Sequence, residues 1–372
     1  MLFSRRYFVK KLHKAFRCVM EKSGRPKKRN IVFDAFTDFH FFHVEPIVKM
    51  LVNDDRFNVI VVMSDNFTLE NAIENVKYIT SHDFKENWSG VYDILITTEF
   101  DRKPRWFGDS IAICMFHGVG PKMGYIRNPK INDYDVIFSA GPATYDVQTG
   151  YVANDTKVIP VGLPVTDSLI DDSEVKLPAS IKLDNSKPTL LYAPSWASDS
   201  NDISMDEGIL KELKNIKDYN IIVRPHPFLL EASKCGGKDW TILFDELAQE
   251  GISISYSNDH SVYQILKYVD VLLGDVSSVV YEYLILNRPI MLYMDDNVLT
   301  NLGAADFLEP LLSASTRVMQ PADLVTKLSD IKVGDESKSQ ARQALLKNTL
   351  FNVGSSTKIA GSEIIKLTYP QS

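Results

Sequence analysis

Short runs of apolar, mostly β-branched residues alternate with helix-like stretches along the chain, and this alternation constrains the fold most. Such runs occupy residues 30–36, 57–64, 92–98, 110–116 and 135–141 in the first half, and 188–194, 219–225, 252–257, 270–275 and 289–294 in the second. Near-continuous apolar runs of this length predict strands that are buried on both faces of parallel sheets. We therefore expect an α/β protein with two Rossmann-like domains whose parallel sheets face a central cleft.

The 372 residues are enough for two domains. A stretch rich in Pro, Asp and Ser over 158–188 separates the two halves and predicts the connection between them. We expect an N-terminal Rossmann-like domain over 30–168, a linker over 169–187, a C-terminal Rossmann-like domain over 188–345, and a final helical segment over 346–372 that packs back toward the N-terminal domain.

The start of the chain differs from the remainder in charge. The first 30 residues hold eleven of the 41 Lys and Arg but only one of the 48 Asp and Glu, with apolar residues interleaved at roughly helical spacing. They lack the uninterrupted apolar core of a secretory signal or a membrane span. We predict a basic amphipathic helix over 1–29 that lies on an anionic membrane surface. A helix docked on the acidic body and a transit peptide are the alternatives. The acidic body argues against nucleic acid as a partner.

Three predicted strand ends carry polar residues, and ligands of open parallel sheets bind beyond such ends. In the first, the run 110–116 is followed by His117, Gly118, Gly120 and Lys122. The imidazole could take a proton from an attacking hydroxyl, and the glycines let the backbone approach a ligand in the cleft. The alternative is a turn histidine that bonds to the backbone.

The second strand end carries Arg224 and His226, and the prolines at 225 and 227 stiffen this loop. Two cationic or proton-donating groups two residues apart suit a phosphate of the donor, because charge-assisted hydrogen bonds are strong. A structural ion pair and a rigid-loop donor are the alternatives.

The third strand end is "GDVSSVVYE" at 274–282. Asp275 or Ser277 can cap the helix that follows, which leaves Ser278 over. A helix start with spare hydroxyls suits phosphate oxygens, so we expect a phosphate site at these three residues. Glu282 lies one turn after Ser278 and could accept hydrogen bonds from the ribose of a nucleotide.

Other polar residues carry weaker signals. Ser195 and Trp196 end the first strand of the second half, where they line either a nucleotide pocket or the edge of the core. His40 and His43 have metal-like spacing, but no carboxylate constellation accompanies them, so we expect a helix start or an acceptor-side loop. His260 is expected at the surface or at a helix start. The three Cys show no metal spacing, and neither a metal nor another cofactor is predicted.

Several motifs together resemble a known family. The segment "DVSSVVYEYLILNRPIMLY" (275–293) is similar to the Asp-x-Ser-Ser signature, helix and Lys/Arg-Pro strand of the CDP-glycerol glycerophosphotransferases, which are teichoic acid primases and polymerases and also occur in capsule polymerases. Further similar motifs are "FHGVGPK" (116–122), "VGLPVTD" (161–167), "LLYAPSW" (190–196), "RPHP" (224–227) and "FNVGSSTKIAGSEII" (351–365). The resemblance runs from about residue 110 to 365.

This resemblance implies a GT-B fold and an enzyme of cell-wall or capsule polymer synthesis. It also implies that 30–168 is the acceptor domain and 188–345 the nucleotide-donor domain. It implies transfer of glycerol or ribitol phosphate from a CDP-activated donor to a hydroxyl of a lipid-linked glycan or polymer, with release of CMP. Such an enzyme works in the cytoplasm, peripherally on the inner face of the bacterial plasma membrane. By position, His117 is the base, His226 binds the donor pyrophosphate, and Ser277 and Ser278 hold phosphate oxygens near Arg224.

Departures from the family pattern keep the substrate open. Glu282 stands where the family usually has Asp, and Val119-Gly120 stands where it has Thr-Pro or similar. A GT-B glycosyltransferase or a 2-epimerase that uses a UDP-sugar is the alternative enzyme. A non-catalytic scaffold tethered to the membrane is the alternative of another class.

Overall fold

The protein is described here from a computed structural model. The structure describes residues 28–65, 72–87, 92–100, 110–120, 127–153, 155–171, 175–196, 205–256, 260–294, 305–331 and 337–369. Residues 1–27 of the predicted basic helix lie outside the described residues, and so does Lys122. Arg29, the last residue of that prediction, opens the first strand.

The described residues form two compact units. The first draws its residues from Met1–His117, Gly124–Asp167 and Leu350–Ser372, and the second from Gly118–Met123 and Ser168–Thr349. The chain thus passes between units directly after His117. Gly118 and Gly120, which the sequence analysis placed in the first domain, belong to the second unit.

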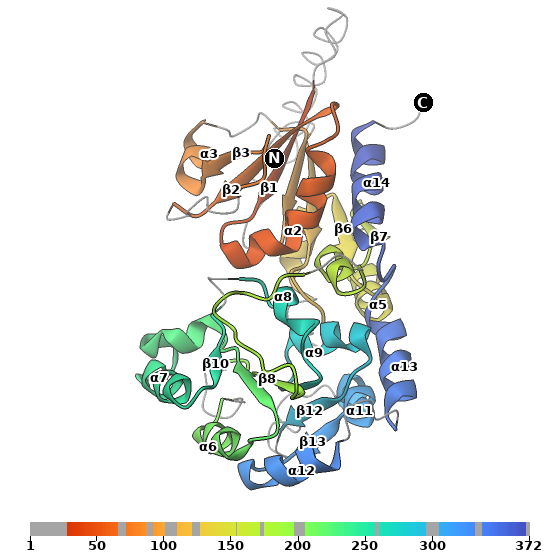
Figure 1. The fold of residues 1–372 in the computed structure, drawn as a ribbon. Helices are drawn as coiled ribbons and strands as arrows, with labels where there is room; N and C mark the ends of the chain where they lie inside the picture. The colour runs from red at the N-terminus through yellow and green to blue at the C-terminus, as the bar shows by residue number, and fades with distance from the viewer. Residues whose placement is uncertain are drawn as a thin grey trace, which may run out of the picture. The chain divides into compact units, whose positions relative to one another are not determined.

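The first unit is built on a seven-stranded sheet in the order β3-β2-β1-β4-β5-β6-β7, and every neighbouring pair is parallel (Figure 1). The strands are β1 (Arg29–Asp34), β2 (Phe57–Met63), β3 (Lys77–Thr80), β4 (Ile94–Thr97), β5 (Ile111–Met115), β6 (Val136–Ser139) and β7 (Lys157–Pro160). The helices are α2 (Asp38–Leu51), α3 (Ser81–Asn87), α5 (Pro142–Thr149) and α14 (Ser356–Thr368), with the 3₁₀ turns η1 (Pro129–Asp133) and η2 (Pro164–Leu169).

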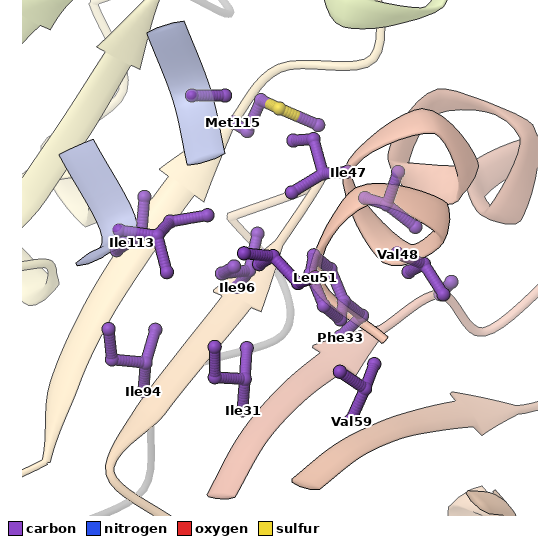
Figure 2. Packing of buried hydrophobic residues seen from close by; sticks show 14 of the residues in the cluster. Ile31, Phe33, Ile47, Val48, Leu51, Val59, Ile94, Ile96, Ile113 and Met115 are labelled. Carbon is purple, nitrogen blue, oxygen red and sulfur yellow. The ribbon is translucent and has the colours of Figure 1, made fainter. Parts of the chain in front are cut away.

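Apolar residues on one face of the first sheet pack against α2 and α14. Figure 2 shows Ile47 and Leu51 of α2 above Ile31, Phe33 and other side chains of the central strands. These side chains are 0–1% exposed. Burial of each is worth roughly 1.5–3 kcal/mol, so this layer fixes where the strands end and the loops begin.

Residues of two motifs that carried the resemblance hold the C-terminal helix α14 in the first unit. The carboxylate of Asp167 accepts from the backbone N–H groups of Ser356 and Thr357 at 3.1 and 2.7 Å, which caps the start of α14. The side chain of Asn352 donates to the carbonyls of Pro160 and Val161 at 3.1 Å. These motif residues therefore have a structural role.

The second unit is built on a six-stranded parallel sheet in the order β10-β9-β8-β11-β12-β13. Its strands are β8 (Thr189–Ala193), β9 (Asn220–Val223), β10 (Ser253–Ile254), β11 (Val271–Gly274), β12 (Ile290–Tyr293) and β13 (Thr316–Val318). Its helices are α6 (Glu207–Asn215), α7 (Thr241–Gln249), α8 (Tyr263–Leu266), α9 (Ser278–Tyr283), α11 (Ala305–Ala314), α12 (Leu324–Asp330) and α13 (Ser339–Thr349), with η3 (Pro227–Leu230), η4 (Ala232–Lys234), η5 (Leu284–Leu286) and η6 (Pro321–Asp323).

The expectation of two parallel-sheet α/β domains is confirmed, and both sheets have the strand order of a Rossmann fold. β3, β7 and β13 were not predicted, and β7 overlaps the start of the stretch over 158–188 that was predicted to connect the domains. Over the residues that the structure describes, no helix is both long and apolar enough to span a membrane.

Candidate active site

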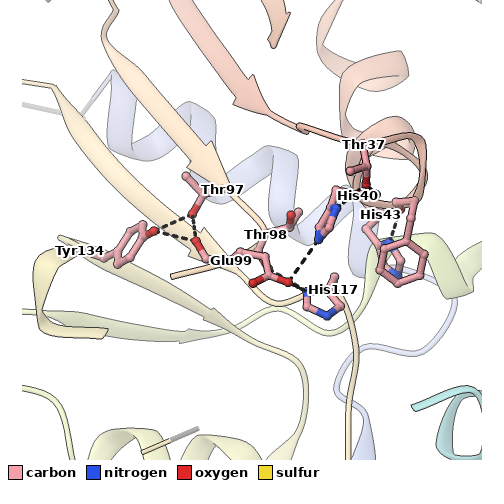
Figure 3. Close-up of polar contacts among 9 residues, drawn as sticks. Thr37, His40, His43, Thr97, Thr98, Glu99, His117 and Tyr134 are labelled. Atoms are coloured by element: carbon pink, nitrogen blue, oxygen red, sulfur yellow. Dashed lines mark hydrogen bonds and ion pairs between the residues drawn. The ribbon is translucent and has the colours of Figure 1, made fainter. Parts of the chain in front are cut away.

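In the first unit, the strand order reverses between β1 and β4, and a polar cluster lies beyond the carboxyl ends of β1, β4 and β5. It contains His40 from the start of α2, Glu99 from the loop after β4, and His117 from the loop after β5 (Figure 3). Ligands of open parallel sheets bind at such reversal points. The sequence prediction for His117 thus places a proton acceptor where the fold favours a ligand.

The hydrogen bonds of His117 determine which ring nitrogen carries its proton. Nδ1 lies 3.0 Å from the carbonyl oxygen of Thr98 and 3.2 Å from Oε1 of Glu99. A carbonyl oxygen can only accept, so Nδ1 must be the donor. In the neutral ring the lone pair is therefore on Nε2, which is the nitrogen that can accept a proton.

His40 and Glu99 form the rest of the cluster. Nε2 of His40 lies 3.2 Å from the same Oε1 of Glu99, and its Nδ1 lies 2.6 Å from Oγ1 of Thr37. Thr37 also caps α2 by accepting from the backbone N–H of His40. As expected, His40 is at a helix start. The expectation that no carboxylate accompanies His40 is wrong, because Glu99 lies between His40 and His117.

His43 lies one turn further along α2 and is 3% exposed. Its Nδ1 lies 2.8 Å from the carbonyl of Phe39, to which it donates. Burial, together with the nearby His117, lowers the pKa of His43 to about 3, although the bond to Phe39 raises it. His43 is therefore neutral at physiological pH and contributes shape to this region rather than charge.

In the second unit, the strand order reverses between β8 and β11, and Asp275 joins the ends of these two strands. Its Oδ2 accepts from the backbone N–H of Ser195 at 2.8 Å and from the hydroxyl of Ser195. The carboxylate is 6% exposed. Asp275 was predicted to cap α9 or to bind a phosphate, but the structure gives it the role of holding Ser195.

The side chain of Ser277, at the start of α9, does not act as the helix cap that was expected. Ser277 is the N-cap residue of α9, but its side chain makes no capping hydrogen bond. Its Oγ is buried and has no hydrogen-bond partner among the described residues. The capping explanation therefore does not account for this hydroxyl. Such an unsatisfied buried hydroxyl costs stability unless a ligand pairs with it.

Glu282 is 2% exposed, and its Oε2 accepts from the hydroxyl of Tyr263 at 2.8 Å. Burial raises the pKa of Glu282 to about 7, and the hydrogen bonds from Tyr263 and Ser278 offset part of this effect. Oε2 of Glu282 thus has an internal partner, whereas Oε1 is buried without a hydrogen-bond partner among the described residues. The contact of Glu282 with ribose stays a prediction.

Two glycines of the His-Gly motif are required by their contacts with α9. A Cβ on Gly118 would come within 2.9 Å of the Cβ of Ser278. The backbone at Gly120 has a φ of +139°, a value that residues other than glycine rarely adopt. The sequence analysis attributed both to ligand approach, but Gly118 lacks a side chain because Ser278 occupies the space.

His226 follows β9 and has the opposite hydrogen-bonding arrangement to His117. Its Nδ1 accepts from the backbone N–H of Phe228 at 3.2 Å. Because a backbone N–H can only donate, the proton of the neutral ring is on Nε2. The ring of Trp196 lies 6.0 Å from that of His226 and packs edge-on against Phe228 at 4.6 Å. His226 thus offers an N–H donor beside an aromatic wall.

Arg224 is part of the internal framework of the second unit. Its guanidinium donates to Oγ of Ser255 at 2.7 Å and to the carbonyl of His260 at 2.9 Å. His260 is 5% exposed, and its Nε2 lies 2.8 Å from the same Ser255 hydroxyl. The expected surface position of His260 is therefore wrong, whereas the alternative, a helix start, fits its place three residues before α8. The predicted phosphate contact of Arg224 gains no direct support.

Comparisons with known proteins indicate the family to which this fold and these motifs belong. The model of the family described as CDP-Glycerol:Poly(glycerophosphate) glycerophosphotransferase matches residues 122–356. The chain is 26% identical over 206 residues to the teichoic acid ribitol-phosphate primase of Bacillus spizizenii, covering 51% of this chain and 48% of that protein. It is 27% identical over 154 residues to the teichoic acid glycerol-phosphate primase of Bacillus subtilis, covering 38% and 34%. The matches thus span half or less of these relatives' length.

Among solved structures, the wall teichoic acid polymerase TagF aligns with a TM-score of 0.70 at 17% identity, covering 97% of both chains. At this identity the likeness shows the fold. The family match begins after His117, so the assignment of His117 depends on its strand-end position and its hydrogen bonds.

Proposed function

Because the chain belongs to the CDP-glycerol:poly(glycerophosphate) glycerophosphotransferase family, we propose that it transfers glycerol or ribitol phosphate from a CDP-activated donor. The acceptor is a hydroxyl of a lipid-linked glycan or polymer in cell-wall or capsule synthesis, and CMP is released. The two relatives described above are named for ribitol phosphate and for glycerol phosphate, so both alditols are donor candidates.

The observation that carries this proposal is the bond from Nδ1 of His117 to the Thr98 carbonyl. It leaves the Nε2 lone pair to accept the proton of the acceptor hydroxyl. The hydroxyl oxygen attacks the phosphorus nearer the alditol, the bond from this phosphorus to the bridging oxygen breaks, and CMP leaves with that oxygen. General-base catalysis of this kind contributes about 10²–10⁴-fold in rate.

The second unit supplies hydrogen-bond donors for the donor pyrophosphate. His226 donates from Nε2, and Ser277 donates its hydroxyl proton to a phosphate oxygen. Ser278 donates to a phosphate oxygen when its hydroxyl turns away from Glu282, with which it interacts in this structure. Loss of one preorganised donor typically costs about 10²–10³-fold in kcat. Asp275 and Arg224 act indirectly, because their bonds fix the strand ends that carry these donors.

The remaining predicted residues have supporting roles. Trp196 and Ser195 line the nucleotide pocket beside His226, and Glu282 shapes it from within. Gly118 and Gly120 let the His-Gly loop approach α9, and Lys122 adds a cation for the donor or the acceptor.

The leader over 1–29 docks the enzyme on the anionic inner face of the bacterial plasma membrane, where a lipid-linked acceptor is found. The first 30 residues hold eleven cationic side chains, and each contributes about 1 kcal/mol of electrostatic attraction near such a surface. Sedimentation with anionic liposomes should retain the full chain and lose a truncation that lacks 1–29. Equal sedimentation of both would separate the leader from membrane binding.

The test of the activity is a CMP-release assay with CDP-glycerol, CDP-ribitol and UDP-N-acetylglucosamine, each with and without a lipid-linked acceptor. We expect acceptor-dependent CMP release from at least one CDP-alditol. Consumption of the UDP-sugar alone would favour the glycosyltransferase or epimerase. No turnover of any donor, with unchanged membrane binding, would favour the scaffold.

A further inference from the structure

We propose that Glu99 is a positioning residue for His117. Its carboxylate orients the imidazole, whose Nδ1–H is held by the Thr98 carbonyl, and stabilises the positive charge that appears when Nε2 takes a second proton. His40 in turn holds Glu99. This inference depends on the proposed role of His117 as the base.

The topology explains why these side chains meet. β4 and β5 are paired in parallel, with Thr97 opposite Cys114. Glu99 lies two residues after the end of β4, and His117 lies two residues after the end of β5. Neighbouring strands that end in step bring these two loops together. Oε1 of Glu99 consequently lies 3.2 Å from Nδ1 of His117.

Glu99 accepts one imidazole N–H group and lies beside a second. The Nδ1–H of His117 bonds the Thr98 carbonyl at 3.0 Å, and Oε1 of Glu99 lies 3.2 Å from the same Nδ1 as an ion-pair contact. An ionised carboxylate has no hydrogen, so Nε2 of His40 donates to the same Oε1 at 3.2 Å. Nδ1 of His40 then accepts from the hydroxyl of Thr37. Every one of these bonds is consistent with neutral imidazoles and a charged Glu99.

Three other titratable groups near the cluster are neutral. His43 has a pKa lowered to about 3 by burial, and burial raises the pKa of the Cys114 thiol and of the Tyr134 hydroxyl well above their usual values. Two further carboxyls belong to the same end of the sheet: Asp38 begins α2, where burial raises its pKa, and Asp34 ends β1, where its charge acts on Tyr134. Glu99 is the carboxylate that lies within 3.2 Å of the His117 ring.

The consequence for proton transfer is electrostatic. When the acceptor hydroxyl gives its proton to Nε2, the O–H bond breaks, an N–H bond forms, and the ring gains one positive charge. Nδ1 keeps its own proton, so Glu99 does not itself become protonated. A carboxylate 3.2 Å from Nδ1 lowers the energy of the imidazolium relative to the neutral ring.

The same three side chains could instead hold a metal ion, because His40, Glu99 and His117 each bring a ligand atom within 4.8 Å of the other two. Nδ1 of His117 carries a proton when it bonds the Thr98 carbonyl, so a metal could bind this ring only through Nε2, the same nitrogen that is proposed to act as the base. The positioning role and metal binding therefore exclude each other, and Zn²⁺ binding and EDTA treatment distinguish them.

The experiment compares Glu99→Gln with Glu45→Gln in the full chain. Glu45 is a matched control because its side chain is 26% exposed, against 24% for Glu99, and it forms an ion pair with Lys49 rather than with the cluster. We expect Glu99→Gln to lower kcat for CMP release about 10- to 100-fold and to move the acid limb of the pH–rate profile to lower pH. The loss is smaller than for a triad carboxylate that alone sets the tautomer, since the Thr98 carbonyl still holds Nδ1–H. Wild-type values in Glu99→Gln would overturn the proposal.

A second measurement does not need activity. Histidine-selective NMR, with the His117 signal assigned from His117→Asn, gives the titration midpoint of this ring. Glu99→Gln should lower the midpoint by about one pH unit, and Glu45→Gln should leave it unchanged. If the wild type releases no CMP, the proposed function fails while this midpoint still decides the role of Glu99. An unchanged midpoint would overturn the proposal. So would activity that EDTA removes and Zn²⁺ restores, together with weaker Zn²⁺ binding by Glu99→Gln.

Discussion

The two units have the same type of parallel sheet but place different chemistry at the point where the strand order reverses. In the first unit, His40, Glu99 and His117 gather there around one carboxylate oxygen. In the second unit, Asp275 is already bonded to Ser195, and the start of α9 presents the Ser277 hydroxyl. In the proposed function, one unit takes up a proton and the other donates hydrogen bonds. Fold similarity alone does not assign function to either site.

The two histidines of the proposed site make this difference concrete. His117 donates from Nδ1, and His226 accepts at Nδ1. The backbone partner determines the tautomer in each case. In the neutral ring, Nε2 therefore carries a lone pair in His117 and a hydrogen in His226. A base and a hydrogen-bond donor are therefore distinguished by one backbone contact each.

Amide substitutions should break this comparison with the largest effect. The side chain of Gln can donate from a position near that of Nε2, but it cannot accept a proton there. We therefore expect His226→Gln to keep CMP release within about tenfold of the wild type, whereas His226→Ala loses about 10²–10³-fold. His117→Gln should lose about 10²–10⁴-fold, as much as His117→Ala. Steady-state kinetics with CDP-glycerol or CDP-ribitol measure all four variants. Equal losses in the two Gln variants would contradict the assignment of the tautomers.

The sequence predicted both sheets but not all of their strands. β3, β7 and β13 were missed, and each is an edge strand. Their residues are mostly exposed or half-buried, unlike the buried residues of β4 and β8. An edge strand packs on fewer neighbours, so selection for a continuous apolar run is weaker, and its local pattern resembles that of a loop. The central strands, which carry the site, were the easiest to predict.

The site was predicted where a residue's chemistry is evident locally, and not where it depends on a distant partner. His117 and His226 were found because each follows a strand in a short motif. Glu99 also follows a predicted strand, but a single carboxylate has no distinctive spacing. The bonds of Arg224 to Ser255 and of Asp275 to Ser195 join segments 31 and 80 residues apart. No local pattern contains such partners.

Glu282 and His43 should sharpen the comparison through opposite responses to pH. The pKa of Glu282 is raised from 4.5 to about 7 by burial, so the folded state binds this proton more tightly than the unfolded state does. The free energy of unfolding therefore falls as pH rises from about 4.5 through 7, by up to about 3 kcal/mol. The pKa of His43 is lowered to about 3, so its contribution falls as pH drops below 6.5.

Glu282→Gln should remove the loss of stability at high pH, because an amide does not ionise. Its oxygen can still accept the hydrogen bond from Tyr263. Urea midpoints of this variant and the wild type, measured from pH 5 to 8, should diverge as pH rises. Glu309→Gln is the control, because Glu309 is exposed on α11. Parallel pH profiles for wild type and Glu282→Gln would show that the folded protein accommodates the charged carboxylate.

The smallest effect separates the two serine hydroxyls of the second unit. Ser195→Ala removes the hydroxyl donor to Asp275 but keeps the backbone N–H at 2.8 Å, so the free energy of unfolding should fall by about 1 kcal/mol. Ser277→Ala removes a hydroxyl without a hydrogen-bond partner among the described residues, and should change it by less than about 0.5 kcal/mol. Donor binding should respond in the other order, because Ser277 is proposed to contact the phosphate directly. Urea unfolding together with calorimetric titration of CDP-glycerol or CDP-ribitol measures both quantities. If Ser277→Ala destabilised the protein as much as Ser195→Ala and left donor affinity unchanged, the hydroxyl would have a structural role. The second unit would then lose its main distinction from the first.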